Sequence, residues 1–326
     1  PVGARSVGMG TGFTAVADDV SALHYNPAGL SGLSAREVSF MYLKGLEGQS
    51  VEYIGTATQL PFGGLIGSGY TSVAGSLLFS QNGSIEVNRT APNGSLLSSS
   101  QISAGGDLVG TLGYAERIFD FELETQRETF QVLQSAGVSG KFIRSSLAEN
   151  YSATAVAADI GYQLSIPESG MSFGASVANV GSRMRFVDAG DPLPMTIRSG
   201  LAFSPALPET LTLPAEQKVV FAMDSDYVTF ERRWHVNFGF EYSALRRYAF
   251  RLGYQFHRDL AGLTMGFGAN WRGVFVDYAW ALSDNLIDTH RFSFTYKFGR
   301  IPAYKREFRR RPYIESMPER EDLRDI

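Results

Sequence analysis

Large apolar residues alternate with small or polar residues along most of this chain, which is typical of β-strands that face two different environments. The pattern is clearest in the last third of the sequence, where one face is aromatic or aliphatic and the other carries Gly, Ser, Thr, Asn or scattered charge. The five segments are Trp234–Tyr242, Tyr248–Phe256, Leu263–Trp271, Val274–Trp280 and Phe292–Phe298, with Phe275 as an exception to the alternation. A strand that crosses a bilayer needs about 9–11 residues, and these segments are close to that length.

The same pattern, followed from Arg36, predicts fourteen strands, with an even number that returns both termini to one side. On the other side the connections include two long loops, Ser80–Gly106 and Gly181–Pro194, whereas several connections on the termini side are tight turns. Long outer loops and short periplasmic turns are typical of outer-membrane barrels. We therefore predict an all-β fold, a fourteen-stranded antiparallel transmembrane β-barrel over residues 36–299.

A soluble β-sandwich is the alternative architecture, because alternation does not say which face is inside. Two observations favour the membrane barrel. The apolar faces end in Trp, Tyr and Phe, as aromatic girdles require, and the opposite faces lack the Lys and Glu of a sandwich surface. No window of eighteen apolar residues predicts a membrane helix. The first residue is Pro1, so we expect that a secretory signal peptide has been removed, and we predict a location in the bacterial outer membrane.

Three segments depart from the strand pattern. Residues 1–35 are rich in Gly and Ala without clean alternation, and we expect them to form an N-terminal plug in the lumen. Phe121–Gln134 consists mostly of good helix formers and predicts a short amphipathic helical insert, with a long polar strand pair as the alternative. Residues 300–326 form a charged tail, expected in the periplasm, that is either solvated or a docking segment for a periplasmic partner.

Composition excludes several classes of function. The net charge of −4 makes nucleic acid an unsuitable partner, and the absence of Cys excludes disulfides and thiolate metal sites. The four His residues show no ligand spacing, and no Ser-His-Asp grouping can be defended. Asp188 and Asp191 share a loop, but two carboxylates favour a hydrogen-bonded turn over a calcium site. We predict neither catalysis nor a cofactor or metal.

The N-terminal motifs carry a family resemblance. Gly3-Ala4-Arg5, Gly8-Met9-Gly10, Ala15-Val16-Ala17-Asp18-Asp19 and Asn26-Pro27-Ala28-Gly29-Leu30 resemble the plug of the FadL superfamily of outer-membrane barrels. Further motifs resemble more closely the PorV/PorQ branch, which is linked to type IX secretion. They are Ala178-Asn179-Val180-Gly181, Phe186-Val187-Asp188, Gly190-Asp191-Pro192-Leu193-Pro194 and the terminal strand from His290 to Gly299. The resemblance implies a fourteen-stranded barrel with its N-terminus folded into the lumen.

Three groups of residues are candidates for function. The expected plug or gate residues are Asp18, Asp19, Asn26, Pro27, Ala28 and Gly29. The expected partner contacts on an outer loop are Phe186, Asp188, Asp191, Pro192, Leu193 and Pro194. The expected lumen charges are Glu241, Arg251 and Asp277, which either pair across the lumen or with the plug, or are separately solvated.

Two functional hypotheses follow from the sequence and the resemblance. The first is a PorV-type binding, shuttle or scaffold protein of a secretion or envelope complex, with secreted cargo or translocon subunits as partners. The second is a FadL-like transporter of hydrophobic small molecules, gated by the plug. Both imply contact with membrane lipid and lipopolysaccharide. An apolar lumen pocket would favour the transporter, whereas a blocked lumen with an apolar groove on the outer loops would favour the shuttle.

Overall fold

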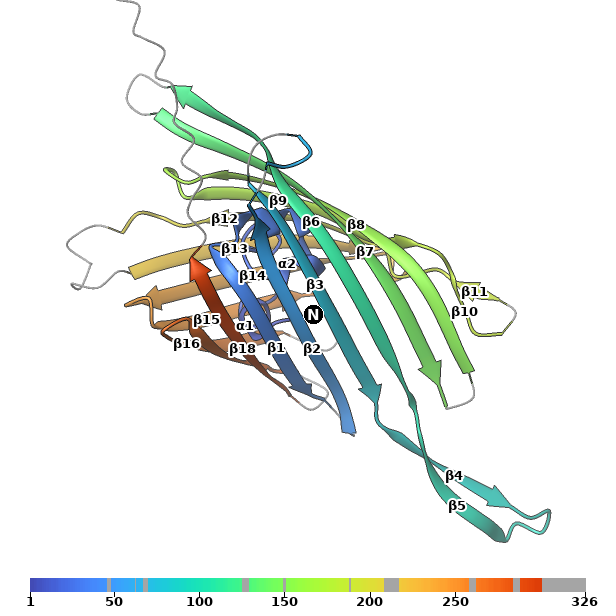
Figure 1. Cartoon of the computed structure of the whole chain (residues 1–326). Helices are drawn as coiled ribbons and strands as arrows, with labels where there is room; N and C mark the ends of the chain where they lie inside the picture. The colour runs from blue at the N-terminus through green and yellow to red at the C-terminus, as the bar shows by residue number, and fades with distance from the viewer. Residues whose placement is uncertain are drawn as a thin grey trace, which may run out of the picture.

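The structure is a computed structural model (Figure 1). It describes residues 1–45, 48–61, 63–66, 70–124, 129–148, 151–187, 189–207, 217–257, 262–283 and 288–300. Among these residues, no helix is long and apolar enough to cross a membrane.

Fourteen strands of the described chain form one closed antiparallel barrel, in which each strand pairs with two neighbours. In chain order they are β1 (Ala35–Lys44), β2 (Gln49–Leu60), β3 (Thr71–Asn82), β6 (Gly105–Glu124), β7 (Thr129–Leu147), β8 (Tyr151–Ile166), β9 (Met171–Gly181), β12 (Thr196–Phe203), β13 (Gln217–Val228), β14 (Arg233–Ala244), β15 (Tyr248–Phe256), β16 (Leu263–Trp271), β17 (Val274–Ala281) and β18 (Thr289–Arg300). β1 closes the ring by pairing with β18, with Phe40 opposite Phe294. The predicted strand number and antiparallel arrangement are confirmed.

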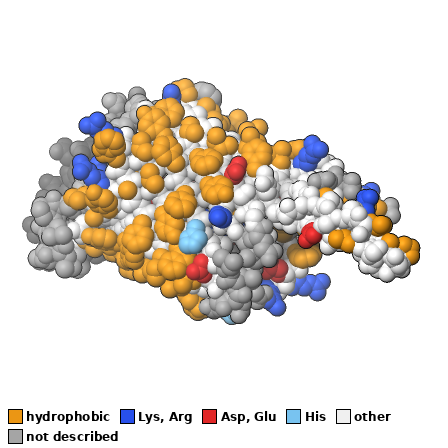
Figure 2. All heavy atoms as spheres, turned by 90° about the horizontal axis from the view of Figure 1, so that it is seen from below, with side chains coloured by type: hydrophobic (Ala, Val, Ile, Leu, Met, Phe, Trp, Pro, Cys, Tyr) orange, Lys and Arg blue, Asp and Glu red, His pale blue; other side chains and the backbone are white. Residues whose placement is uncertain are grey.

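The barrel wall is polar inside and apolar outside, the reverse of a soluble sandwich. Phe238, Phe267 and Phe294 are 42%, 56% and 48% exposed, whereas Asn237 and Thr264 are fully buried. Figure 2 shows hydrophobic side chains spread over this outer wall, with few charges among them. The two-residue period of a strand produces this sorting, because successive side chains point to opposite faces.

The N-terminal segment, residues 1–34, packs against the inner face of the ring and contains short helices. These are α1 (Ala4–Gly8), α2 (Ala22–Tyr25) and the 3-10 turn η1 (Pro27–Gly32). Figure 1 shows α1 and α2 surrounded by strands. Met9, Phe13 and Leu23 are completely buried in a cluster that includes inward-facing residues of the strands. The segment therefore supplies much of the hydrophobic core.

The helix predicted at Phe121–Gln134 is wrong over the described part of this segment, which leaves out residues 125–128. β6 and β7 instead continue as a paired hairpin to Glu124 and Thr129, with Phe121 opposite Val132 and Leu123 opposite Phe130. These cross-strand apolar pairs outweigh the helical propensity of the intervening polar residues. The alternative of a long polar strand pair describes this segment correctly.

The predicted loop Ser80–Gly106 is also not irregular. It contains the hairpin β4 (Ser84–Thr90) and β5 (Leu96–Ser103), which projects well away from the barrel at the end opposite the β6–β7 tip (Figure 1). Gly181–Pro194 holds a smaller hairpin, β10 (Met184–Arg185) and β11 (Gly190–Asp191). The tail after Arg300 lies outside the described residues.

Candidate functional site

Arg5 joins the N-terminal segment to the barrel wall, because it pairs with Glu241 of the wall and with two acidic side chains of the segment. Its guanidinium donates to both oxygens of Glu241 on β14, at 2.9 and 3.1 Å. A further nitrogen lies 2.5 Å from Asp18 and 3.7 Å from Asp19, both within the segment. A bidentate pair of this kind fixes orientation as well as distance. Arg5 therefore holds the segment in register with the wall.

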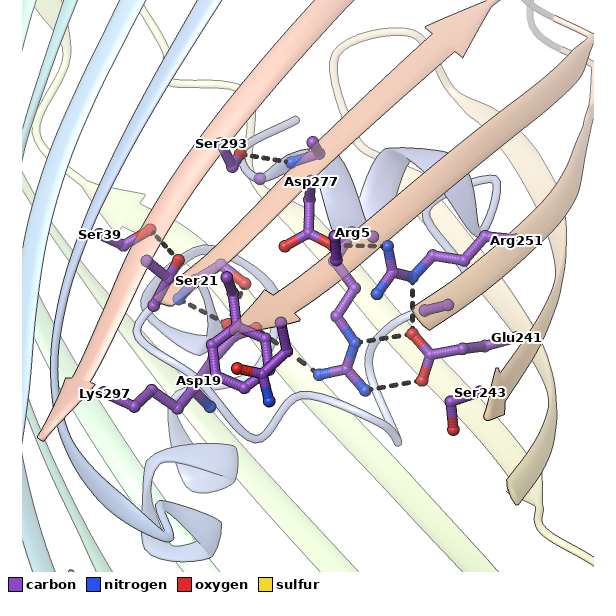
Figure 3. Close-up of a pocket in the computed structure, with 18 of the residues that line it drawn as sticks. Arg5, Asp19, Ser21, Ser39, Glu241, Ser243, Arg251, Asp277, Ser293 and Lys297 are labelled. Carbon is purple, nitrogen blue, oxygen red and sulfur yellow. Dashed lines mark hydrogen bonds and ion pairs between the residues drawn. The ribbon is translucent and has the colours of Figure 1, made fainter. Parts of the chain in front are cut away.

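The ion-pair network continues along the inner face of the neighbouring strands. Arg251 on β15 lies 2.6 Å from Glu241 and 2.7 Å from Asp277 on β17 (Figure 3). The three predicted lumen charges thus lie together and pair with one another. Arg5 adds the link to the segment. Each charge has an opposite partner, and the attraction within these pairs offsets the cost of removing the charges from water.

A cavity of about 380 Å³ lies beside this network, between the segment and the wall. Asp18 is 46% exposed there, in contrast to the 8% exposure of Glu241. The polar and charged side chains that line it come from the segment and from β1, β13–β18 and the β14–β15 turn. They include Asp19, Ser21, Glu37, Ser39, Lys218, Ser243, Arg246, Arg247, Asn270, Ser293 and Lys297. The cavity is suited to water and polar groups.

Asn26 fastens the end of the segment that precedes β1. Its side-chain amide donates to the carbonyls of Thr14 and of Tyr162 on β8, at 3.0 and 2.9 Å. Its Oδ1 accepts from the Ala28 amide at 3.2 Å, which caps η1. Pro27 at the first turn of η1 adds a preset φ. The predicted Asn26–Gly29 motif is thus a buried turn that ties the segment to itself and to the wall.

Glycines on the inner wall let the segment approach backbone to backbone. A Cβ at Gly253 would overlap Met9 and Gly10, and one at Gly137 would overlap Pro27 and Ala28. Gly10 itself has φ of +62°, which favours glycine. A larger residue at these wall positions would push the segment away from the barrel.

Further hydrogen bonds attach the segment at widely separated strands. Asp224 on β13 accepts from the amides of Phe13 and Thr14, at 2.8 and 2.7 Å. Glu37 on β1 accepts from the amide of Val20 and pairs with Lys297 at 3.1 Å. These contacts are made by side chains, and no described residue of the segment pairs with a strand of the barrel.

The pKa values of Asp18 and His24, both in the segment, are lowered. Although burial of the site opposes its ionisation, Arg5 holds the pKa of the Asp18 carboxyl below its usual value. Burial lowers the pKa of His24 to about 3, assisted by the positive charges of Lys141 and the N-terminus. His24 packs edge-on against Tyr53 at 5.3 Å between ring centroids. Near neutral pH, Asp18 is therefore charged and His24 neutral.

The predicted outer-loop residues lie far from this network, around the β10–β11 hairpin. Asp191, Pro192 and Pro194 are exposed, and Phe186 and Leu193 are half-buried. Asp188 lies outside the described residues. Asn179, at the base of this loop, donates to the Pro194 carbonyl at 3.1 Å and accepts from Lys141. Within the described chain, no three His, Asp or Glu side chains gather as metal ligands.

Sequence reasoning missed the residues that join segment and wall, above all Arg5, Glu37, Asp224 and Lys297. Arg5 stands in the N-terminal motif, but Glu241 is 236 positions away, so no local pattern pairs them. The sequence did contain a signal for them. A charged residue on an inward strand face that otherwise carries small residues needs a partner, because a buried charge requires one.

No protein-family model and no curated protein sequence matches the chain. Solved structures do resemble it. The Ralstonia pickettii toluene transporter TbuX aligns with a TM-score of 0.53 at 12% identity, over 91% of this chain and 98% of that one. The deltaS2 mutant of the TodX monoaromatic hydrocarbon channel aligns with a TM-score of 0.51 at 12% identity, over 91% and 99% of the two chains.

A Pseudomonas aeruginosa FadL homologue aligns with a TM-score of 0.48 at 8% identity, over 91% of this chain and 98% of that one. At these identities the likeness concerns the fold. The chain thus shares the barrel fold of TbuX and TodX, and the PorV/PorQ branch finds no support among these structures.

Proposed function

We propose that this protein is an outer-membrane conduit of the FadL type for hydrophobic small molecules, and that the N-terminal segment is its plug. One observation carries the proposal. The segment occupies the inner face of a closed barrel and is bound there by side-chain hydrogen bonds and ion pairs, without strand pairing. Such contacts can be broken and remade while the barrel stays intact, because the strand ladder does not depend on them.

The outer wall supports placement in a bilayer. Exposed aromatic and aliphatic side chains surround the barrel, and the charged groups of the network face inward. A monomeric soluble protein rarely exposes so large an apolar surface. Lipid of the bacterial outer membrane, including lipopolysaccharide, is the partner that this surface fits.

The hydrophobic cargo is proposed from two considerations. TbuX and TodX, which share the fold, are described as carriers of toluene and monoaromatic hydrocarbons. In this chain, Met9, Phe13 and Leu23 of the plug belong to one buried cluster with apolar side chains of the wall such as Met41 and Tyr53. Displacement of the plug would uncover these apolar side chains within an otherwise polar inner wall, and a hydrocarbon would pass along them.

Toluene uptake tests this function. A Gram-negative host without such a transporter would express the protein, and entry of radiolabelled toluene would be followed at low external concentration. We expect the initial rate to rise several-fold above that of cells with an empty vector. An unchanged rate, with the folded barrel present in the outer membrane, contradicts the proposal.

A second candidate, the protein-binding scaffold or shuttle, is favoured by the β4–β5 hairpin. It projects beyond the barrel, and its Ile85, Leu96 and Leu97 are 44%, 61% and 68% exposed. Secreted proteins or translocon subunits would be its partners, together with the β10–β11 loop. The test replaces residues 84–103 by Asn-Gly and compares co-purified proteins. A partner lost with the hairpin, at unchanged toluene entry, supports this role, and identical co-purification contradicts it.

A further inference from the structure

Arg291 is a buried cation on the inner face of β18, near the end of the barrel away from the Ala35–Arg300 pair. It is the third residue of the strand, and it lies opposite Leu43 on β1 and Ala279 on β17. Only 8% of the residue is exposed. A guanidinium is not deprotonated in proteins, so this position holds a permanent positive charge.

No described residue neutralises this charge. The guanidinium of Arg291 makes no hydrogen bond or ion pair with any described residue, and its Nε is buried without a partner. Asp277, the diagonal carboxylate on β17, pairs with Arg251 at 2.7 Å. Tyr25 of the N-terminal segment interacts electrostatically with Arg291, but its hydroxyl is bound to the Val2 carbonyl at 3.0 Å. Both neighbouring groups are therefore already engaged.

Four other cations on the inner wall show what Arg291 lacks. Arg251, Lys141 and Lys297 lie 2.6, 2.7 and 3.1 Å from a carboxylate of the wall, and Arg198 lies 3.8 Å from one. In each case the attraction within the pair offsets the loss of hydration. A buried guanidinium without such a partner loses its hydration and gains nothing in return, so the site at Arg291 requires an anion that the wall does not supply.

The neighbours of Arg291 are small and apolar. Ala279 and Ala281 on β17 form a buried cluster with Ala4 and Val7 of α1. Water is excluded from this cluster, and an anion beside it would therefore be attracted to the guanidinium with little screening. Because the surrounding side chains are buried, the ion that fits here is a small one.

Ser293 offers a second donor on the same face of β18, because strand residues two apart point to the same side. Its hydroxyl oxygen accepts from the Ala4 amide at 2.8 Å, as Figure 3 shows. That bond uses a lone pair of the oxygen and leaves the hydroxyl proton able to donate to a bound anion. The Ala4 amide also fixes the start of α1 beside this position.

We propose that Arg291 binds a small monovalent anion between β18 and the N-terminal segment. The guanidinium and the Ser293 hydroxyl donate to it, and the anion takes the place that a wall carboxylate has beside the other cations. It thereby neutralises the inner face against which α1 packs. This site does not depend on the transport function.

The dependence of stability on the anion tests the site. The full-length protein, folded in lipid vesicles, would be unfolded with urea at constant ionic strength while sodium chloride replaces sodium gluconate, whose anion is much larger. We expect chloride to lower the unfolding equilibrium constant, about elevenfold at ten times the dissociation constant. Sodium acetate forms a second series. Protection by both anions supports a site that also accepts a carboxylate, and protection by chloride alone supports a halide site.

Substitution of Arg291 assigns the effect. Arg291→Gln should abolish the difference between chloride and gluconate, and Arg291→Lys should keep part of it. Lys218→Gln removes an exposed cation of the cavity on β13 and is the matched control, which should respond to chloride like the wild type. Heat-modifiable gel mobility verifies that each barrel is folded.

Bromide provides a readout that needs no variant. Crystals of the wild type soaked in sodium bromide should show anomalous density beside the Arg291 guanidinium, even if Arg291→Gln does not fold. Absence of this density overturns the proposal. So does an unfolding constant that is the same in chloride, acetate and gluconate, or a chloride response that persists in folded Arg291→Gln.

Discussion

Arg5 is the residue that joins the N-terminal segment to the wall most directly. Its guanidinium contacts Glu241 of the wall and Asp18 of the segment at the same time. Glu241 also receives Arg251, so the wall charges remain paired if Arg5 leaves. The network is therefore asymmetric: losing Arg5 frees the segment, whereas Arg251 still pairs with both Glu241 and Asp277 of the wall.

We expect Arg5→Ala to lower the free energy of unfolding by about 3 kcal/mol, the usual cost of removing one partner from a buried pair. Urea unfolding in lipid vesicles measures the change. Arg89→Ala, on the exposed β4–β5 hairpin, is the control and should change stability by less than about 0.5 kcal/mol. Equal effects of the two variants would contradict the role of Arg5 in holding the segment against the wall.

Gly253→Ala tests the close approach of segment and wall. The added methyl group would overlap Met9 and Gly10, whereas a Cβ at Gly140, on the outer face of β7, meets no atom within 4 Å. We expect Gly253→Ala to expose residues 1–20 to limited proteolysis while the barrel keeps its heat-modifiable mobility. In the Gly140→Ala variant, the protease should cut residues 1–20 as slowly as in the wild type. Full protection of the Gly253→Ala segment would show that the contact is not required.

At the scale of the element, alternation predicted most of the strands, and the aromatic strand ends together with the scarcity of Lys and Glu on the opposite faces predicted the side that faces inward. Glu241, Arg251 and Asp277 were placed on one surface because each alternates with the large apolar residues of its own strand. Alternation did not reveal which of them pair, since register between strands determines that. Glu241 is opposite Arg251 on the neighbouring strand, a relation that appears only once β14 and β15 are aligned.

The error at Phe121–Gln134 has an equally specific cause. Local composition favours a helix, but Phe119, Phe121 and Leu123 also alternate with period two. The partner strand then places Val132 and Phe130 opposite Phe121 and Leu123. Cross-strand pairing is non-local, so residue propensity read along the chain underestimates it.

Phe267→Arg tests which face of the strands meets lipid. Phe267 lies in the middle of β16 on the outer face, and an arginine near the bilayer midplane costs about 2–4 kcal/mol of folding free energy. Trp271→Arg, at the end of the same strand, should cost about 0–1 kcal/mol. Folding into vesicles of defined thickness measures both. Equal, small costs would contradict the placement of this face in the membrane.

The whole molecule is a closed barrel with the N-terminal segment of the same chain packed inside it. The wall is held by fourteen strand ladders, whereas the segment is held by its hydrophobic cluster and a set of side-chain contacts. Under the proposed function, this division of forces lets the segment move without unfolding the barrel. Gly and Ala enrichment in residues 1–35 predicted a compact body against the wall. It did not predict the attachment points, which are spread over strands distant in sequence.

A reversible disulfide between plug and wall tests the central claim most directly. The hydroxyls of Ser31 on η1 and Ser135 on β7 lie 2.7 Å apart, so Ser31→Cys with Ser135→Cys can close with little movement. We predict that the oxidised double variant loses at least nine-tenths of its toluene uptake and that a reductant restores it, while each single variant transports like the wild type. Undiminished uptake by the fully oxidised protein would contradict a moving plug.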